Sequence, residues 1–537
     1  MGDRGRPALF TIPAHRAFAD ALVAGIMARQ GRDPLALSRG MILLPSNRGV
    51  RAVADAFVRA SGGGLLLPRL IPIGDPDIGE QVGGALDPLG EDDPIAPAIA
   101  PMQRQMILAR LVQQAQPGID AGQALKLGQA LGQVLDQMQV ERLTPDALRK
   151  LSLSEELSGH WQKSLILFEI IIARWPVELA RLGCIDLVDR RNRLFDRLAK
   201  RWADAPPSGF VVAAGISTTA PAVAGLLRRI GEIPGGMVVF AGLDQHMDDA
   251  AWQAIGPFDP DPVTGRAPAG HESHPQYALK RLLHAMSATR DDVAQWRWGS
   301  EHDARAVRGR NISIAIALRE ALETPGRTAA LVTPDRQLAT RVSAHLRRWG
   351  IEADDSAGLP LSRLPPGTLL IAMAQAVAER FAPVALLTLL KHPLVMRGAG
   401  RLAWLEGVRG LDLLLRGPRP QAGLIGIDQT LRPREDEDRQ GALREQVRDW
   451  WPQARALLEP LERAFLATPD LSGQLAAIRE QAGALTGDAI WAGHQGQAAA
   501  DLFAEMEAAA PEGPRQADMR ALPVRHRAAI RASPYWA

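Results

Sequence analysis

Apolar runs and helical stripes alternate over the first part of the chain. Residues 8–12 are an apolar run that Pro13 ends, and apolar residues then recur at helical spacing from Phe18 to Ile26. A second run, residues 41–44, precedes another apolar stripe from Val50 to Phe57. Two consecutive strand–helix units predict a parallel sheet of the α/β class.

The middle of the chain interrupts this alternation. Residues 68–101 are rich in Pro, Gly and Asp and predict a long loop. Residues from 102 to about 200 carry helical stripes, and a largely buried helix is expected over residues 163–172. The strand–helix pattern then returns, with strands predicted at residues 210–214 and 237–241 and a helix between them.

The last part of the chain is mainly helical. Helices are predicted over residues 311–322 and 336–349, strands over residues 329–332 and 351–353, and helices again from residue 373 onward. This order predicts an α/β core interrupted by helical insertions. The predicted divisions are the first half of an α/β domain (1–100), a helical insertion (101–205), the second half of that domain (206–305), the start of a second α/β domain (306–372), a helical region (373–510) and an Arg-rich tail (511–537).

Composition narrows the class of protein. Apolar residues make up 46% and charged residues 23% of the 537 positions, which excludes a wholly disordered chain and a collagen-like repeat. The formal net charge is only +2, so we expect a local basic path rather than a basic surface. The single cysteine, Cys184, excludes an internal disulfide and a site that needs several thiolates from this chain. Because there is neither a secretion signal nor an apolar run of membrane-spanning length, we expect a cytoplasmic protein with no membrane partner.

The first strand–helix junction lacks the residues of a phosphate-binding loop. A Walker A motif needs glycines, a lysine and a Ser or Thr between a strand and a helix. Residues 11–16 contain neither glycine nor lysine, and Pro13 removes a backbone donor. We expect no ATP site and no cofactor in this chain.

Acidic and histidine residues form no recognisable catalytic or metal motif. Asp244 follows the strand predicted at residues 237–241, but a single Asp there is more often a helix cap or a loop residue than a magnesium ligand. Residues 271–274 (His-Glu-Ser-His) lack the H-E-x-x-H spacing, and the acidic residues 435–438 are expected to form an exposed loop. We therefore assign no catalytic and no metal-binding residue.

Arginines stand at the start of two predicted helices. Arg48 and Arg51 follow the strand at residues 41–44, and Arg336 and Arg341 follow the strand predicted at residues 329–332. Helix N-termini after parallel strands bind anions, and ligands of open α/β sheets lie at this edge. The four arginines are candidate DNA-backbone contacts, which would be independent of sequence and sensitive to salt. Because only six of the 62 cationic residues are Lys, a placement that reflects composition alone is the alternative.

Nine segments resemble the alphaproteobacterial type of the AddB family of double-strand-break repair proteins. They keep their order from about residue 8 to about residue 505, and read FTIPAHRAF (10–18), ILLPSNRGVR (42–51), LPRLIPIGD (67–75), GCIDLVDRRNR (183–193), VVAAGISTTA (211–220), HPQYALKRLL (274–283), ALVTPDR (330–336), RWGIEADDSAGLP (348–360) and LLTLLKHPL (386–394).

The resemblance implies a subunit of the AddAB helicase–nuclease, which processes broken duplex ends for homologous recombination. In that family an AddA-type subunit supplies ATP-driven unwinding. The AddB subunit has a degenerate superfamily 1 helicase-like fold, with RecA-like parallel-sheet domains and large helical insertions, and helps to recognise the recombination hotspot. The implied partners are the AddA-type subunit, DNA ends and single-stranded DNA.

The C-terminus departs from the family pattern. The family's nuclease domain, with its metal-binding acids and catalytic Lys, would follow residue 537, and no lysine of this chain stands in a D/E-x-K arrangement. Nuclease activity is therefore not carried over. We expect a DNA-binding, non-motor subunit of an AddAB-type complex, and the alternative is a truncated remnant or scaffold that binds the partner subunit without DNA or catalytic activity.

Overall fold

The computed structural model describes most of the 537 residues and divides them into two units. The described residues are 7–14, 16–30, 34–61, 64–73, 94–116, 118–143, 170–258, 270–298, 311–333, 335–355, 358–433, 440–467 and 470–514. Unit 1 comprises Met1–Ala98, Met138–Leu143 and Gly183–Asp354, and unit 2 comprises Ile99–Gln137, Thr144–Leu182 and Asp355–Ala537.

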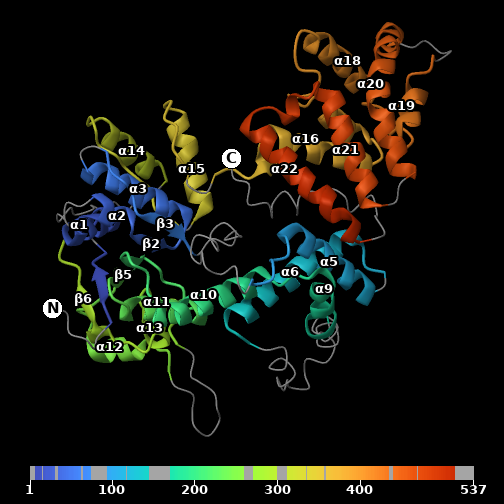
Figure 1. The fold of residues 1–537 in the computed structure, drawn as a ribbon. Helices are drawn as coiled ribbons and strands as arrows, with labels where there is room; N and C mark the ends of the chain where they lie inside the picture. Colours follow the sequence, from blue (N-terminus) through green and yellow to red (C-terminus); the bar gives the residue numbers. More distant parts are fainter. Residues whose placement is uncertain are drawn as a thin grey trace. The chain divides into compact units, whose positions relative to one another are not determined.

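Unit 1 contains a six-stranded parallel sheet (Figure 1). Its strands are β1 (Leu9–Ile12), β2 (Met41–Leu44), β3 (Arg69–Pro72), β4 (Val211–Ala214), β5 (Gly236–Ala241) and β6 (Val293–Gln295). Their order across the sheet is β3-β2-β4-β5-β1-β6, and Leu9 of β1 lies opposite both Val238 and Val293. The α/β class and the parallel sheet predicted from the sequence are confirmed.

Helices cover both faces of this sheet. One face carries α1 (Phe18–Gln30), α2 (Pro34–Ser38) and α3 (Asn47–Ser61), and the other carries α10 (Leu187–Asp204), α11 (Pro221–Glu232), α12 (Asp249–Ala254) and α13 (Tyr277–Ala285). Alternate residues of one strand serve the two cores, because Ile42 and Leu44 pack on the first face and Met41 and Leu43 on the second. Burial on both faces explains why the inner strands are continuous apolar runs.

The two edge strands, β3 and β6, are not predicted from the sequence. β3 lies within residues 68–101, which the composition predicts to be a loop, and residues 74–93 of that segment lie outside the described residues. The strand predicted at residues 329–332 is wrong, since the segment has no regular structure and Val332 is 94% exposed. The strand predicted at residues 351–353 is also wrong. An apolar run becomes a strand only where a neighbouring strand satisfies its backbone groups and other residues cover its side chains.

A helix pair occupies the region between these two failed strands. As predicted, α14 (Asn311–Leu322) and α15 (Arg336–Arg347) form, and Ala315, Val342 and Leu346 make a small apolar core between them. The sequence predicts that a second α/β domain starts at residue 306. The structure has no strand in the described residues 311–333 and 335–355 of this predicted domain.

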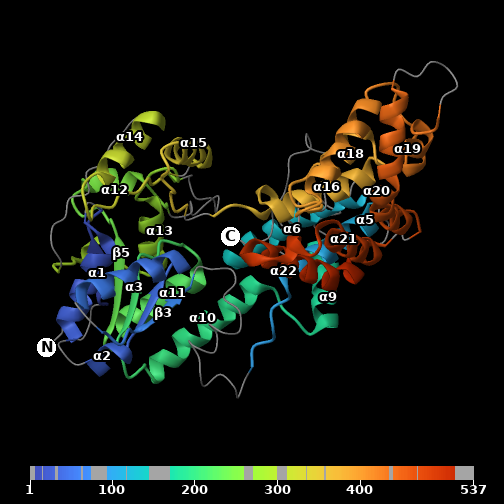
Figure 2. The ribbon, with the colours of Figure 1, turned by 90° about the horizontal axis from the view of Figure 1, so that it is seen from above.

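Unit 2 is helical over its described residues. Figure 2 shows α16, α20, α21 and α22 packed side by side. The helices of unit 2 are α5 (Pro101–Ala115), α6 (Ala121–Val140), the π-helix η3 (Ile170–Arg174), α9 (Trp175–Leu182), η5 (Leu361–Arg363), α16 (Pro365–Ala378), α17 (Pro383–Leu390), α18 (Arg401–Leu414), α19 (Leu424–Thr430), α20 (Gly441–Ala467), α21 (Leu471–Thr486), η6 (Ala489–Trp491), α22 (Gly493–Ala509) and η7 (Ala510–Glu512). The last residues of α6 belong to unit 1. In unit 1, the short helix η4 (Arg290–Asp292) precedes β6.

The predicted helical character is confirmed for the described part of this region. Most of the buried helix predicted at residues 163–172 lies outside the described residues. Within the described ranges, no helix combines the length and the apolar character needed to span a membrane.

Candidate nucleic-acid interface

The connections that leave β2 and β4 diverge to opposite faces of the sheet. The two strands are neighbours, with Leu43 opposite Ala213. α3 follows β2 and packs in one apolar core, whereas α11 follows β4 and packs in the other. Such a divergence is a topological switch point, the position at the carboxyl ends of the strands where open α/β sheets bind ligands, and we call this position the β2–β4 crevice.

The N-terminus of α3 lies at this crevice, two residues after β2 ends. The Ser46 hydroxyl accepts a hydrogen bond from the Gly49 N–H at 3.4 Å, which provides a neutral cap. The first turn contains no acidic residue. Arg48 lies in this turn and Arg51 one turn further, and both are exposed. Neither side chain forms an ion pair or hydrogen bond with another residue that the structure describes.

This arrangement favours a bound anion. The helix dipole is positive at the N-terminus, and a cation there is typically unfavourable by about 0.3–1 kcal/mol. Among the described residues no carboxylate pairs with these two guanidinium groups, so they leave a local positive charge that no described residue neutralises. A phosphate group would neutralise it, because it accepts paired hydrogen bonds from Arg and from helix N–H groups.

The loop between β4 and α11 adds two hydroxyl groups that the sequence reasoning missed. Ser217 and Thr218 are exposed and lie shortly after the end of β4. α11 begins with Pro221 and has no side-chain cap. Hydroxyl side chains and helix N-termini are common contacts to phosphate oxygens. A run of three hydroxyl residues, 217–219, two residues after a fully buried strand was the signal available in the sequence.

The connection after β1 differs, because its guanidinium group already bonds to backbone carbonyls. Arg16 lies in the β1–α1 connection, where a phosphate loop would stand. Its Nη1 donates to the Trp296 carbonyl at 2.8 Å, and its Nη2 donates to the Trp298 carbonyl. The side chain therefore ties the start of α1 to the segment after β6.

Asp244, the candidate magnesium ligand, serves as a local cap. Its carboxylate accepts hydrogen bonds from the N–H groups of His246 at 2.9 Å and Met247 at 3.0 Å. Its own N–H donates to Gln276 Oε1 at 3.0 Å, and Gln276 Nε2 donates to the Gly242 carbonyl at 2.9 Å. Asp244 is therefore a loop residue, one of the two roles that the sequence favoured, and the cap of α12 is Asp248.

Arg336 and Arg341 are exposed on α15, in a setting unlike that of Arg48 and Arg51. No strand precedes α15, and none of its residues belongs to the two apolar cores of the sheet. Asp335 caps the helix, and its carboxylate accepts from the N–H groups of Gln337 at 2.8 Å and Leu338 at 3.1 Å. An acidic cap uses these donors and repels a second anion.

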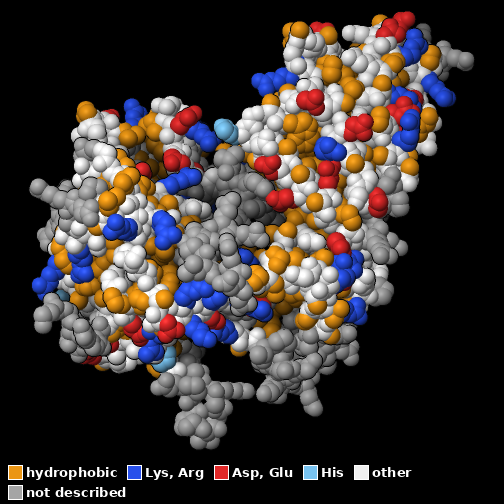
Figure 3. All heavy atoms as spheres, viewed as in Figure 1, with side chains coloured by type: hydrophobic (Ala, Val, Ile, Leu, Met, Phe, Trp, Pro, Cys, Tyr) orange, Lys and Arg blue, Asp and Glu red, His pale blue; other side chains and the backbone are white. Residues whose placement is uncertain are grey.

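The other charged residues that the sequence singled out form no second candidate site among the described residues. Figure 3 shows basic and acidic side chains interspersed over the visible surface. Residues 271–274 form a turn in which His274 Nδ1 accepts the Gln276 N–H at 3.2 Å. Over the described ranges, no group of three His, Cys, Asp or Glu side chains is placed to hold a metal ion. The acidic residues 435–438 lie outside those ranges.

A comparison with models of protein families and a comparison with curated proteins both found no match.

Proposed function

We propose that this chain is a DNA-binding, non-motor subunit of an AddAB-type helicase–nuclease that processes double-strand breaks for homologous recombination. The observation that carries DNA binding is the pair Arg48 and Arg51, which have no partner among the described residues and stand at a serine-capped helix N-terminus beside the β2–β4 crevice. The AddA-type partner and the repair context come from the resemblance alone.

The β1–α1 connection supports a role other than that of a motor. A motor subunit needs backbone donors and a lysine at this connection to bind the nucleotide phosphates. This chain has Pro13 there, and Arg16 donates to backbone carbonyl groups instead. The geometry favours a chain that holds DNA while its partner hydrolyses ATP.

Exposure of the two arginines favours a polymer over a small anion. Their side chains are open to solvent, and residues three positions apart on a helix have Cβ atoms about 5–6 Å apart. Two guanidinium groups at this spacing suit a phosphate backbone that passes across the edge of the sheet. Contacts of this kind hold any sequence and weaken as salt is added.

The test is a fluorescence-anisotropy titration of a labelled single-stranded oligonucleotide at several salt concentrations. We expect the Arg48→Ala/Arg51→Ala variant to bind about tenfold more weakly at low salt, from the loss of two charge-assisted contacts. Its plot of log K against log salt should also be flatter by about 1.4, or about 0.7 for each lost phosphate contact. The Arg336→Ala/Arg341→Ala variant should show a smaller loss, because Asp335 lies at its helix start.

The matched control is Arg347→Ala/Arg348→Ala, which removes the same charge from the exposed end of α15. Equal losses in this control and in Arg48→Ala/Arg51→Ala would show that net charge, not the crevice, holds the DNA. No binding by the unaltered chain at low salt would favour the alternative, a truncated remnant or scaffold that binds only the partner subunit.

A further inference from the structure

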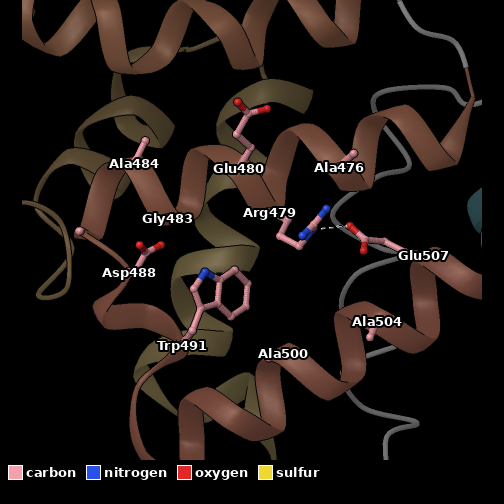
Figure 4. Close-up of a pocket in the computed structure, with 11 residues that line it drawn as sticks. Ala476, Arg479, Glu480, Gly483, Ala484, Asp488, Trp491, Ala500, Ala504 and Glu507 are labelled. Atoms are coloured by element: carbon pink, nitrogen blue, oxygen red, sulfur yellow. Dashed lines mark hydrogen bonds and ion pairs between the residues drawn. The ribbon is translucent and has the colours of Figure 1, made fainter.

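A groove of about 860 Å³ runs between α21 and α22 in unit 2 (Figure 4). Small residues line both of its walls, so that the groove lies close to the helix backbones. They are Ala476, Gly483 and Ala484 on α21 and Ala500 and Ala504 on α22. Between Ala476 and Ala484 the wall is about 12 Å long at 1.5 Å per residue, which is about two helical turns.

Each end of the groove carries a distinct feature. At one end Gly487 and Asp488 both have positive φ, 57° and 63°, and this tight turn places Trp491 beside α21. At the other end Arg479 Nε lies 2.8 Å from Glu507 Oε1, and this ion pair joins α21 to α22. An aromatic ring therefore marks one end and a paired charge the other.

The lining has an excess of negative charge. Its charged residues are Arg479, Glu480, Asp488 and Glu507, and the one cation is already paired with Glu507. Glu480 and Asp488 are exposed, and neither forms an ion pair with another residue of the described ranges. A Cβ on Gly483 would lie 2.7 Å from Asp488 Oδ1, so a glycine here lets this carboxylate approach α21 closely.

We propose that this groove binds a basic helical segment of a partner protein. An Arg or Lys of the segment pairs with Asp488 and contacts the Trp491 ring, as cations do on aromatic faces. Small apolar residues of the segment pack against the alanine walls, and a second cation reaches Glu480. This mode, a helix laid in a groove, uses side chains at one-turn spacing as anchors. Because the excess charge is negative, the groove selects a basic protein segment and repels DNA, which makes it independent of the crevice in unit 1.

The test uses the full chain and a fluorescein-labelled, alanine-rich peptide with an arginine at every fourth position, followed by anisotropy. Asp488→Asn removes the charge, and Asn tolerates the left-handed backbone conformation of this position. We expect it to weaken peptide binding about threefold, because one charge-assisted contact becomes a neutral hydrogen bond. Ala504→Trp fills the groove from an exposed position on α22 and should abolish binding.

The control is Glu445→Gln, which removes an exposed carboxylate of α20 outside the groove and should leave peptide binding unchanged. Equal losses in Glu445→Gln and Asp488→Asn would mean that the peptide senses only overall charge, and would overturn the proposal. Unchanged binding in Ala504→Trp would overturn it as well. Self-association of the full chain that Ala504→Trp abolishes, measured by sedimentation, would assign the groove to a second copy instead. Oligonucleotide binding should be the same in Asp488→Asn and the unaltered chain, so each proposal can fail without the other.

Discussion

Gly25 of α1 is in contact with the indole ring of Trp296, which follows edge strand β6. Trp296 is fully buried, and its Nε1 donates to the Ala21 carbonyl at 2.7 Å. A Cβ on Gly25 would lie 2.1 Å from the indole ring, well inside any normal contact distance. The hydrogen bond and the burial hold the ring in place, so a methyl group on this residue has no room.

We expect Gly25→Ala to lower the free energy of unfolding by about 1–3 kcal/mol, the usual cost of overpacking a core. Gly225→Ala on α11 is the matched control, since its Cβ would meet nothing within 4 Å. At that exposed helical position Ala should stabilise by up to about 1 kcal/mol. Urea denaturation followed by circular dichroism measures both, and equal effects would contradict the packing explanation.

His392, which follows α17, is held in its neutral form by its surroundings. Its Nδ1 accepts the Leu394 N–H at 3.3 Å, and its Nε2 lies 2.9 Å from Thr368 Oγ1 on α16. Burial, reinforced by the nearby Arg401 guanidinium, lowers the pKa of His392 from 6.5 to about 4. Protonation would place an N–H of the ring against the Leu394 N–H and break this contact.

Because the pKa is lower in the folded state, the unfolded chain binds the proton first as pH falls. The stability that the neutral ring provides is therefore complete above about pH 6.5 and is lost progressively between about pH 6.5 and pH 4. His392→Gln, which keeps an N–H donor for Thr368, should flatten the dependence of urea stability on pH over this interval. A variant that loses stability over the interval as steeply as the unaltered chain would exclude His392 as the titrating group.

Some individual residues of the candidate nucleic-acid interface could be predicted from the sequence. Arg48 and Arg51 could be placed because the buried strand and the apolar stripe around them have clear patterns. Asp335 was the missed signal on α15, because an acidic residue directly before a helix start is a strong cap and reverses the local preference for anions. Ser217 and Thr218 were missed because hydroxyl residues are common in loops and become informative only once β4 lies beside β2.

At the scale of elements, a network of four charged residues joins α5, α9 and η7 in unit 2. Arg110 on α5 bonds to Glu178 of α9 and to Glu512 of η7, each at 3.2 Å, and its side chain is only 15% exposed. Arg181 contacts the same two carboxylates, each at 2.9 Å. Both glutamates therefore depend on shared cations, and three elements that are distant in the sequence are tied together.

We expect Arg110→Met to lower the free energy of unfolding by roughly 2–4 kcal/mol, because it leaves two partly buried carboxylates with one cation between them. Arg59→Met is the control, since the Arg59–Asp20 pair is more than half exposed on both sides and should contribute less than about 1 kcal/mol. Thermal and urea denaturation of both variants measure the difference. A loss in Arg110→Met no larger than in Arg59→Met would contradict the structural role of the network.

Whether an element was predictable depended on how completely it is buried. β2 and β4 are buried at every residue and give unbroken apolar runs, so both were predicted. β3 and β6 lie at the sheet edges and are partly exposed. Their sequences, RLIP and VAQ, are not unbroken apolar runs. The failed strand at residues 329–332 shows the opposite error, because an apolar run without a sheet neighbour leaves Val332 in solvent.

Across the whole molecule, positive and negative charges nearly balance, so only their local arrangement can create a charged binding surface. The net charge of the chain is only +2, yet it includes two oppositely charged surfaces. Two arginines lie at the crevice in unit 1 and two carboxylates in the groove of unit 2, and none of these four is paired with another residue that the structure describes. Composition could therefore predict neither surface. The groove depends on how the consecutive helices α21 and α22 pack, and the crevice depends on β4 lying beside β2 although about 170 residues separate them; composition contains neither relation.

The strand order of the sheet also determines when the protein can fold. Among the described strands β1 pairs with β5 and β6, and Val238, the partner of Leu9 on β5, is made roughly 230 residues later. At about 5–20 residues per second, a ribosome needs on the order of ten to fifty seconds to deliver that partner. During this interval the two sheet partners of β1 have not yet been made, while the helices of the insertion are being synthesised. A shortened chain that ends before β5 would therefore leave both edges of β1 without these partners, whereas one that ends between β5 and β6 would leave only one edge open.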